Sequence, residues 1–131
     1  MNVAELMQTD VRTVRSDSTL AEVVESLADG HVTALPVVDS QRRLQGVVSS
    51  ADVLRAQAEA SATDRDAWRE TLVQDVMSRP ALTIAPDAEI RSAAQQMLYG
   101  EVHRLFVEAD GKLVGVVSQT DLVRVLASRK V

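Results

Sequence analysis

The sequence predicts a mixed α/β fold of the α+β type, built from two copies of one strand-helix-strand-strand-helix unit. A first repeated pattern, Val-x-x-x-Met, occurs at residues 3–7 and again at 73–77, a shift of 70 residues. A second pattern, Gly-Val-Val-Ser-x-x-Asp, closes each copy at residues 46–52 and 115–121. Repetition over this length is the signature of one duplicated supersecondary unit, so we interpret fold and function as a pair.

Length and composition limit the classes of protein to which the chain can belong. Its 131 residues suit one compact domain, or two half-domains that share a core. Hydrophobic residues make up 46% of the chain but aromatic residues only 2%, so aliphatic side chains and methionine must build the core. A net charge of −5 and the scarcity of aromatic stacking platforms argue against nucleic acid or an anionic membrane as a partner.

Targeting signals and cysteine chemistry are absent from the sequence. The chain has no cysteine, which excludes disulfides and thiolate metal sites. Residues 1–5 lack the charged-then-apolar layout of a secretory signal. No apolar run approaches the roughly 20 residues that a membrane-spanning helix needs. We therefore expect a cytoplasmic protein that does not associate with membranes.

The elements of the first copy follow from its apolar spacing and its cap residues. Residues 17–19 (Asp-Ser-Thr) supply N-cap side chains before a helical stripe, and Gly30 is expected to end that helix in the usual glycine position. Ser49 is expected to open a second helix. The predicted elements are a strand at 11–14, a helix at 20–27, strands at 32–38 and 44–48 on either side of a polar turn, and a helix from 49.

The second copy follows the same plan. Apolar residues recur at helical spacing between Ile90 and Met97. Strands are predicted at 102–107 and 113–117, and the sequence Ala-Asp-Gly-Lys at 109–112 is typical of the hairpin turn that joins them.

A polar segment without glycine or proline connects the two copies. Its composition favours a continued helix over residues 56–72, with a polar break near 61–64. Trp68 and Leu72 are expected to pack it against the body of the protein. We therefore divide the chain into a first repeat at 1–56, a helical linker at 57–72 and a second repeat at 73–131.

The Ser-x-x-Asp turns carry the strongest chemical signal, and they allow two interpretations. In the first, backbone N–H groups at the tip of a helix attract phosphate, and the aspartate accepts hydrogen bonds from both hydroxyls of a ribose. In the second, the same spacing is a capping box, which stabilises a helix without any ligand. The two copies do not separate these interpretations, because a duplicated cap would also repeat.

The whole chain resembles a pair of cystathionine-beta-synthase (CBS) domains, often called a Bateman module. The resemblance covers residues 3–126 and rests on the order and double occurrence of several weak patterns. These patterns are the starts Leu6-Met7 and Val76-Met77, the threonines of the first strands, Leu35-Pro36-Val37 in the middle strand, and both Gly-Val-Val-Ser-x-x-Asp segments.

The resemblance implies two units packed by their sheets around a pseudo-twofold axis, with two clefts for adenosine-containing ligands. By motif position, Asp52 and Asp121 would hold ribose hydroxyls, and Ser49 and Ser118 would contact phosphate. The residues that would lie beside the base are Thr13 with Val14, Thr83 with Ile84, and Pro36. A base held between aliphatic side chains suits a chain this poor in aromatic residues.

The two copies differ at the middle strand. The second copy begins this strand with His103 and Arg104, a pair that in the family often reaches a nucleotide phosphate, and the planar donors of arginine suit that geometry. A solvated strand-end charge and a histidine hydrogen-bonded in place are the structural alternatives. The second copy also has Phe106 where the pattern expects proline, so the shape of its base pocket is open.

Motifs for catalysis and metal binding are absent. The sequence contains no phosphate-binding loop of the NTPase or dinucleotide type and no nucleophile elbow. His31 and His103 lack metal-ligand neighbours at helical spacing. We therefore expect neither an enzyme nor a required cofactor.

Two hypotheses follow for the function. The first is a regulatory module that senses AMP, ADP, ATP or S-adenosylmethionine and signals to an unidentified protein partner, with a homodimer as the expected assembly. The second is a structural or dimerisation module whose clefts are vestigial. Neither ligand identity nor the number of occupied clefts follows from the sequence.

Overall fold

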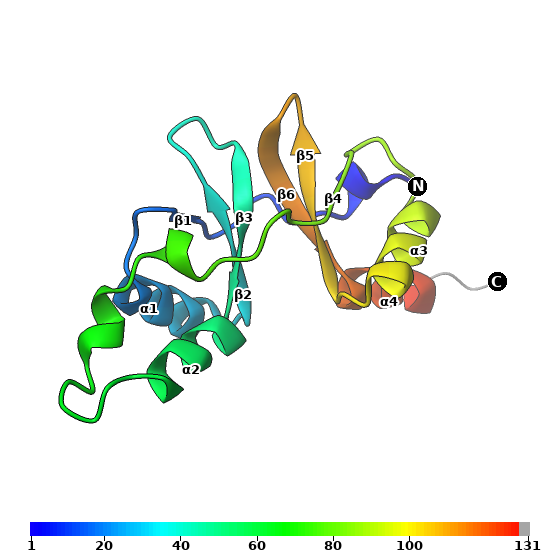
Figure 1. The fold of residues 1–131 in the computed structure, drawn as a ribbon. Coiled ribbons are helices and arrows are strands. Elements are labelled where there is room, and N and C mark those ends of the chain that lie inside the picture. The colour runs from blue at the N-terminus through cyan, green and yellow to red at the C-terminus, as the bar shows by residue number, and fades with distance from the viewer. Residues whose placement is uncertain (129–131) are drawn as a thin grey trace. The chain divides into compact units, whose positions relative to one another are not determined.

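Two three-stranded sheets and four α-helices make up the part of the chain that the structure describes. The structure is a computed structural model, and it describes residues 1–128 (Figure 1). Contacts divide the chain into two compact units. The middle unit is Arg12–Ala81, and the split unit combines Met1–Val11 with Leu82–Val131.

The middle unit confirms the predicted order of strand, helix, strand, strand and helix. Its β1 runs parallel to β2, and β2 runs antiparallel to β3, which gives the sheet order β1-β2-β3. The elements are β1 (Val14–Arg15), α1 (Leu20–Gly30), β2 (Ala34–Val38), β3 (Leu44–Ser49) and α2 (Ser50–Ala58).

The split unit repeats this arrangement. The parallel pair β4 and β5 and the antiparallel pair β5 and β6 form a sheet of order β4-β5-β6. The elements are β4 (Thr83–Ile84), α3 (Ile90–Gly100), β5 (Arg104–Ala109), β6 (Lys112–Ser118) and α4 (Gln119–Ser128). Among residues 1–128, no helix is both long and apolar enough to cross a membrane.

Each unit has its own aliphatic core, formed where its two helices cover one face of its sheet (Figure 1). In the middle unit, Leu20 and Val23 of α1 pack with Leu35 and Val48 of the sheet, and all four are almost fully buried. In the split unit, Ala93 and Met97 of α3 pack with Leu105 and Val117 of the sheet. The prediction of a core built from aliphatic residues and methionine is confirmed.

The ends of α1 show one correct prediction and one error. Thr19 is the N-cap and forms a capping box with Glu22, as its residue type predicts. At the other end, His31 rather than Gly30 adopts the left-handed conformation, with φ 50°. Gly30 is the last residue of α1, and a Cβ atom there would meet only the movable side chain of Arg12, with Cδ at 2.8 Å, and that of Val32.

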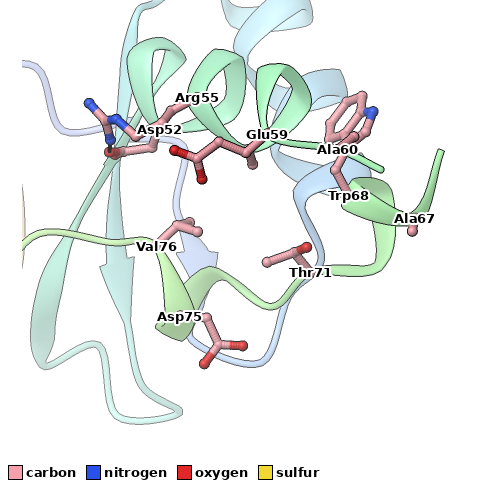
Figure 2. A pocket seen from close by; sticks show the side chains of 10 residues that line it. Asp52, Arg55, Glu59, Ala60, Ala67, Trp68, Thr71, Asp75 and Val76 are labelled. Atoms are coloured by element: carbon pink, nitrogen blue, oxygen red, sulfur yellow. Dashed lines mark hydrogen bonds and ion pairs between the residues drawn. The ribbon is translucent and has the colours of Figure 1, made fainter. Parts of the chain in front are cut away.

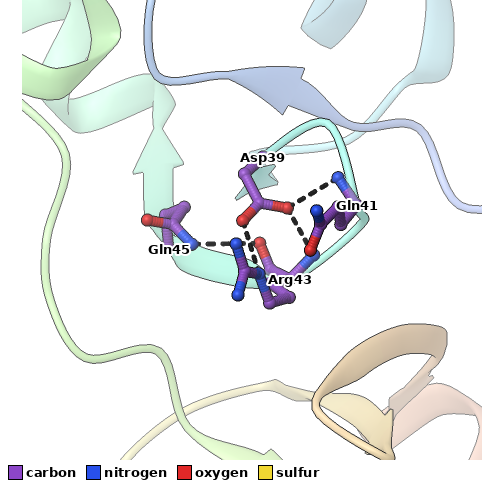
Figure 3. Close-up of polar contacts among 4 residues, drawn as sticks. All are labelled: Asp39, Gln41, Arg43 and Gln45. Atoms are coloured by element: carbon purple, nitrogen blue, oxygen red, sulfur yellow. Dashed lines mark hydrogen bonds and ion pairs between the residues drawn. The ribbon is translucent and has the colours of Figure 1, made fainter.

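The two β-hairpins turn by different means. In the split unit, Asp110 and Gly111 both have positive φ and form the two-residue turn that their sequence predicts. In the middle unit, the carboxylate of Asp39 accepts hydrogen bonds from the backbone N–H groups of Gln41 and Arg43 and from Nε of Arg43 (Figure 3). These bonds, led by that from the Arg43 backbone, hold the pKa of Asp39 below its ordinary value.

The connection between the copies has turns at the predicted polar break near 61–64, but it is not an α-helix after that break. Helix α2 ends at Ala58, and the chain then makes turns before a short 3-10 helix, η2 (Ala67–Glu70). Ser61 explains the break, because its hydroxyl bonds to the hydroxyl and the backbone N–H of Thr63 and so competes with helical bonds. Trp68 packs against the core of the middle unit, as predicted. The division of the chain at residues 56 and 72 stays a prediction.

The start of each copy packs into the unit that contains the end of the other copy. These two arms begin with 3-10 helices, η1 (Val3–Glu5) and η3 (Val73–Asp75). Val3 is fully buried in the core of the split unit, and Val73 is fully buried in that of the middle unit.

Each arm then crosses the last strand of the sheet at a glycine. Ser78 forms a bridge with Val47 of β3, and Gln8 forms one with Val116 of β6. A Cβ atom on Gly46 would lie 2.5 Å from the carbonyl oxygen of Ser78. The glycine of the repeated Gly-Val-Val-Ser pattern is therefore needed for the close approach of the arm.

Candidate functional site: two Ser-x-x-Asp turns

Both Ser-x-x-Asp turns form the capping contacts that one interpretation of the sequence predicts. In the middle unit, Oδ2 of Asp52 accepts from the backbone N of Ser49 at 2.8 Å, and Oγ of Ser49 accepts from the Asp52 backbone N at 3.3 Å. The corresponding distances for Asp121 and Ser118 are 2.9 Å and 3.1 Å. The turns are thus structural elements in both units.

Capping leaves each carboxylate with unused acceptor capacity. Asp52 and Asp121 are the buried charged residues of the described chain, each 8% exposed. A carboxylate has about four lone-pair sites. Capping of the backbone N–H uses one of them on Oδ2, and in Asp52 the hydroxyl of Ser49 donates to the same atom at 3.0 Å. The Oδ1 atom of each aspartate therefore decides whether the site can accept hydrogen bonds from a ligand.

The Oδ1 atoms meet different partners in the two units. In the middle unit, Nη1 of Arg55 lies 3.2 Å from Oδ1 of Asp52 and forms an ion pair. In the split unit, Nε2 of Gln8 lies 3.5 Å from Oδ1 of Asp121, a long hydrogen bond to a neutral group. The Asp121 carboxylate is therefore the less strongly engaged of the two.

The strand register brings Arg104 beside the turn of the split unit. Arg104 lies directly opposite Ser118 in the antiparallel pair β5 and β6, so both side chains project from the same face of the sheet. Burial lowers the pKa of the Arg104 guanidinium from its ordinary value, and arginine nevertheless stays protonated in proteins. A half-buried cation, a serine hydroxyl and the N-terminus of α4 thus lie next to one another, which suits a phosphate.

His103 lies at the same corner of the split unit. Its Nδ1 is 3.2 Å from Oε1 of Gln119, and its carbonyl accepts from the backbone N of Gln119 at 2.9 Å. His103 and Arg104 thus both lie near the Ser-x-x-Asp turn of the second copy. A role for either residue in ligand binding stays a prediction.

The same sheet face carries the residues expected beside the base in the split unit. Thr83 pairs with Phe106, and Phe106 pairs with Val116 on the neighbouring strand. Phe106 is buried but does not belong to the core between sheet and helices. It therefore adds an aromatic side chain to the face where the sequence pattern expects proline.

In the middle unit, the equivalent face is less polar. Ala34 occupies the position opposite Ser49, and Pro36 pairs with Val47. Thr13 directly precedes Val14, whose register partner in β2 is Val37. This unit therefore carries Pro36 and Ser49 on one sheet, with Thr13 just before β1, but places no cation opposite its serine.

Two predicted site residues belong to the cores. Val14 and Ile84 are 7% and 5% exposed and pack with the helices of their units. Their side chains are therefore committed to packing, and contact with a base would fall to their backbone groups.

Three residues near the turns were not predicted from the sequence. Arg55 lies three residues after Asp52, so helical spacing could have revealed it. Gln119 directly follows Ser118 and could have been found in the same way. Gln8 lies 113 residues from Asp121 in the sequence, and only the crossing of the arm brings them together.

A separate pocket of about 590 Å³ lies in the middle unit (Figure 2). One wall is a face of α2 that carries Asp52, Arg55 and Glu59, and the opposite wall comes from the segment 67–76. All of its lining residues belong to the middle unit, and it shares only Asp52 with the predicted nucleotide-binding residues.

The duplicated fold and the two Ser-x-x-Asp turns define a tandem pair of small α+β modules. Comparison with known families gives this class its name: the family model "CBS domain" matches residues 3–59 and 73–128. The chain therefore belongs to the CBS domain family and contains a pair of these domains. The expected resemblance and the mixed α+β fold are both confirmed.

Solved structures of other CBS domain proteins are similar to this chain. The CBSX2 protein, solved in complex with AMP, is 29% identical, with a TM-score of 0.82 over 96% of each chain. An acetoin utilization protein (AcuB) of Vibrio cholerae is 27% identical, with a TM-score of 0.85 over 97% of this chain and 90% of the other.

Relatives of known sequence vary in length. An uncharacterized 17.7 kDa protein of Acidianus ambivalens is 30% identical over 95% of this chain and 72% of its own length. By contrast, the chain spans only 43% of the length of an uncharacterized protein of Methanocaldococcus jannaschii, to which it is 26% identical.

Proposed function

We propose that the chain is a non-catalytic regulatory module that binds an adenine nucleotide in the split unit and signals this to a partner protein. The observation that supports the proposal is the convergence of Arg104, Ser118 and Asp121 at one corner of that unit. AMP is the first candidate ligand, because a structure 29% identical to this chain was solved with AMP. ADP, ATP and S-adenosylmethionine are the other candidates.

Each of the three side chains would meet a different part of the nucleotide. The unused lone pairs of the Asp121 carboxylate would accept hydrogen bonds from the two ribose hydroxyls. Arg104 would contact the phosphate, together with the Ser118 hydroxyl and the N-terminus of α4. Phe106 and Thr83 lie on the same sheet face and would form part of the surface for the base. These are binding interactions, and none of them provides a nucleophile with a general base.

A binding event at this corner would be transmitted through conformational preference. A ligand shifts the balance between two arrangements only by the difference of its affinities for them. We propose that a homodimer and a separate target protein receive this change. The cytoplasmic location stays a prediction.

A structural or dimerisation module is the second candidate function. It is favoured by the capping contacts of both turns, since these give Asp52 and Asp121 a role without any ligand. In this alternative, Arg104 is a strand-end charge and no nucleotide binds.

Calorimetric titration with AMP and with adenosine separates the two functions. Arg104→Ala is expected to weaken AMP about tenfold or more and to leave adenosine unchanged, because hydrogen bonds to charged groups contribute about 1.5–3 kcal/mol. Arg91→Ala, an exposed arginine on α3 of the same unit, is the matched control and should change neither affinity.

The unmodified protein provides the decisive comparison. AMP at 100 times its dissociation constant should add about 2.7 kcal/mol to the free energy of unfolding. If AMP, ADP, ATP and S-adenosylmethionine all bind undetectably and leave the unfolding temperature unchanged, the regulatory proposal is wrong and the structural alternative remains.

A further inference from the structure

The pocket beside α2 has the dimensions of a small-molecule site. Its volume of about 590 Å³ falls in the range that such sites occupy, roughly 300–1,000 Å³. It is complete within the middle unit, because every lining residue lies between Asp52 and Val76. It therefore needs no contribution from the split unit.

Two carboxylates that line the pocket, those of Glu59 and Asp75, form no ion pair with a described residue. Arg55 lies between two acidic residues of α2, Asp52 and Glu59, and it pairs with Asp52. The ion pairs found among residues 1–128 do not include Glu59. Figure 2 shows the Glu59 carboxylate extending from α2 into the space above Val76 and Thr71. The pocket thus presents an unpaired negative charge.

Apolar side chains make up about half of the lining, beside the charged residues and Thr71. Ala56, Ala60 and Val76 contribute small aliphatic surfaces, and Trp68 closes the end near Ala60 (Figure 2). The indole of Trp68 already attracts one cation, since the guanidinium carbon of Arg69 lies 4.9 Å from its ring centroid. A pocket lined by both an aromatic ring and a free carboxylate favours a ligand with an apolar body and a positive charge.

Other classes of ligand fit the pocket less well. An anion would be repelled by Glu59, and a neutral apolar molecule would bury that carboxylate without a partner, which is costly. No group of three or more potential metal ligands occurs among the described residues, which argues against a metal ion.

We propose that this pocket binds a small organic cation, an ammonium group on an apolar body, with Glu59 as the counter-ion and Trp68 as part of the apolar wall. The site is distinct from the nucleotide corner of the split unit. Its ligand chemistry is opposite in charge to that of a nucleotide.

Three probes of similar shape test the charge preference directly. Phenethylammonium carries the positive charge, 2-phenylethanol is its neutral analogue, and 3-phenylpropionate is its anionic analogue. Trp68 is the single tryptophan of the chain, so its fluorescence reports on the pocket alone. Phenethylammonium should change this fluorescence saturably at lower concentration than either analogue, and calorimetry should give the same dissociation constant.

Substitution of the counter-ion tests the site. Glu59→Gln should weaken phenethylammonium about fivefold, as expected for a partly exposed ion pair, and should leave 2-phenylethanol unchanged. Glu25→Gln, an exposed glutamate on α1 outside the pocket, is the matched control. Because Glu59 is exposed and has no ion-pair partner, both variants should unfold at the temperature of the unmodified protein.

Several results would overturn the proposal. Equal affinity for the cationic and neutral probes, or no saturable response at millimolar concentration, shows that the pocket does not select cations. Unchanged binding in Glu59→Gln, with loss of binding when AMP is added, would place the probe at the nucleotide-binding residues instead. AMP binding is measured in a separate titration. The test of the proposed regulatory function is therefore independent of this result.

Discussion

The two units share a fold and a repeated turn, but they differ in what surrounds the carboxylate of that turn. In the middle unit, Asp52 is engaged by the cation of Arg55, and Ala34 faces Ser49 across the sheet. In the split unit, Oδ1 of Asp121 accepts from the neutral side chain of Gln8, and Arg104 faces Ser118. The duplicated sequence preserves the parts that fold each turn and varies the charges beside it. A shared scaffold therefore carries two turns with different charges beside them.

The largest expected effect is a loss of folding stability when the glycines that the arms cross, Gly46 and Gly115, are replaced by alanine. Gly46→Ala should lower the free energy of unfolding by about 3 kcal/mol, because its Cβ would meet the backbone oxygen of Ser78 at 2.5 Å. Gly115→Ala should cost about 1–2 kcal/mol, because its nearest neighbours are Sδ of Met7 at 2.8 Å, which can move, and a backbone oxygen at 2.9 Å. Urea denaturation measures both.

Gly30→Ala is the control for these glycine substitutions. The nearest atom to its Cβ would be the flexible Cδ of Arg12, and alanine favours the helix. We expect little loss of stability. An equal loss in all three variants would show that the arms do not impose the requirement for glycine.

A smaller effect is expected at the ion pair of the middle unit. Arg55→Ala frees Oδ1 of Asp52, so the affinity of the middle unit for adenosine should rise by up to about fivefold, the limit for an exposed ion pair. Arg124→Ala changes the equivalent position of the split unit and should have no such effect, since no ion pair joins Arg124 to a described residue. Calorimetry with adenosine measures both. A fall in affinity in Arg55→Ala would show that Arg55 itself contacts the ligand.

The smallest effect concerns the hairpin turn of the middle unit. The pKa of Asp39 is lowered in the folded protein, so its ionised form stabilises the fold above the unfolded-state pKa of about 4. This stabilisation is lost as the pH falls through the folded pKa. In Asp39→Asn, the free energy of unfolding should therefore fall less steeply with decreasing pH below about pH 4.

Denaturation at several pH values between neutrality and pH 2 measures that slope. Asp110→Asn, in the two-residue turn of the split unit, is the control, because asparagine also tolerates its positive φ. If the two variants give the same pH dependence, the hydrogen bonds of Asp39 do not contribute to acid stability.

Much of the fold follows from local sequence. The N-cap at Thr19, the hairpin at Asp110 and Gly111 and the caps at Ser49 and Ser118 each depend on neighbours within four residues. Such signals can be recognised in a single sequence, and their recurrence revealed the duplicated unit.

The remaining features depend on contacts between distant residues. The hydrogen bond between Gln8 and Asp121 joins residues 113 positions apart, and no local pattern predicts it. Gly30 looks like a left-handed helix cap in the sequence, but His31 takes that conformation and Gly30 is the last residue of the helix. The linker was expected to be helical with a polar break near 61–64. The break is present, with local hydrogen bonds of Ser61 in it, but the weak helical preference of the residues after it yields only a short 3-10 helix.

Because each arm packs into the unit that contains the end of the other copy, a chain with only one copy of the repeat would be incomplete. A protein that began at residue 73 would lack the segment that carries Val3 into the core and Gln8 across β6. It could fill that place only with the corresponding arm of another molecule. Folding of a lone repeat would therefore depend on the protein concentration. Duplication within one chain supplies the missing arm at a fixed local concentration.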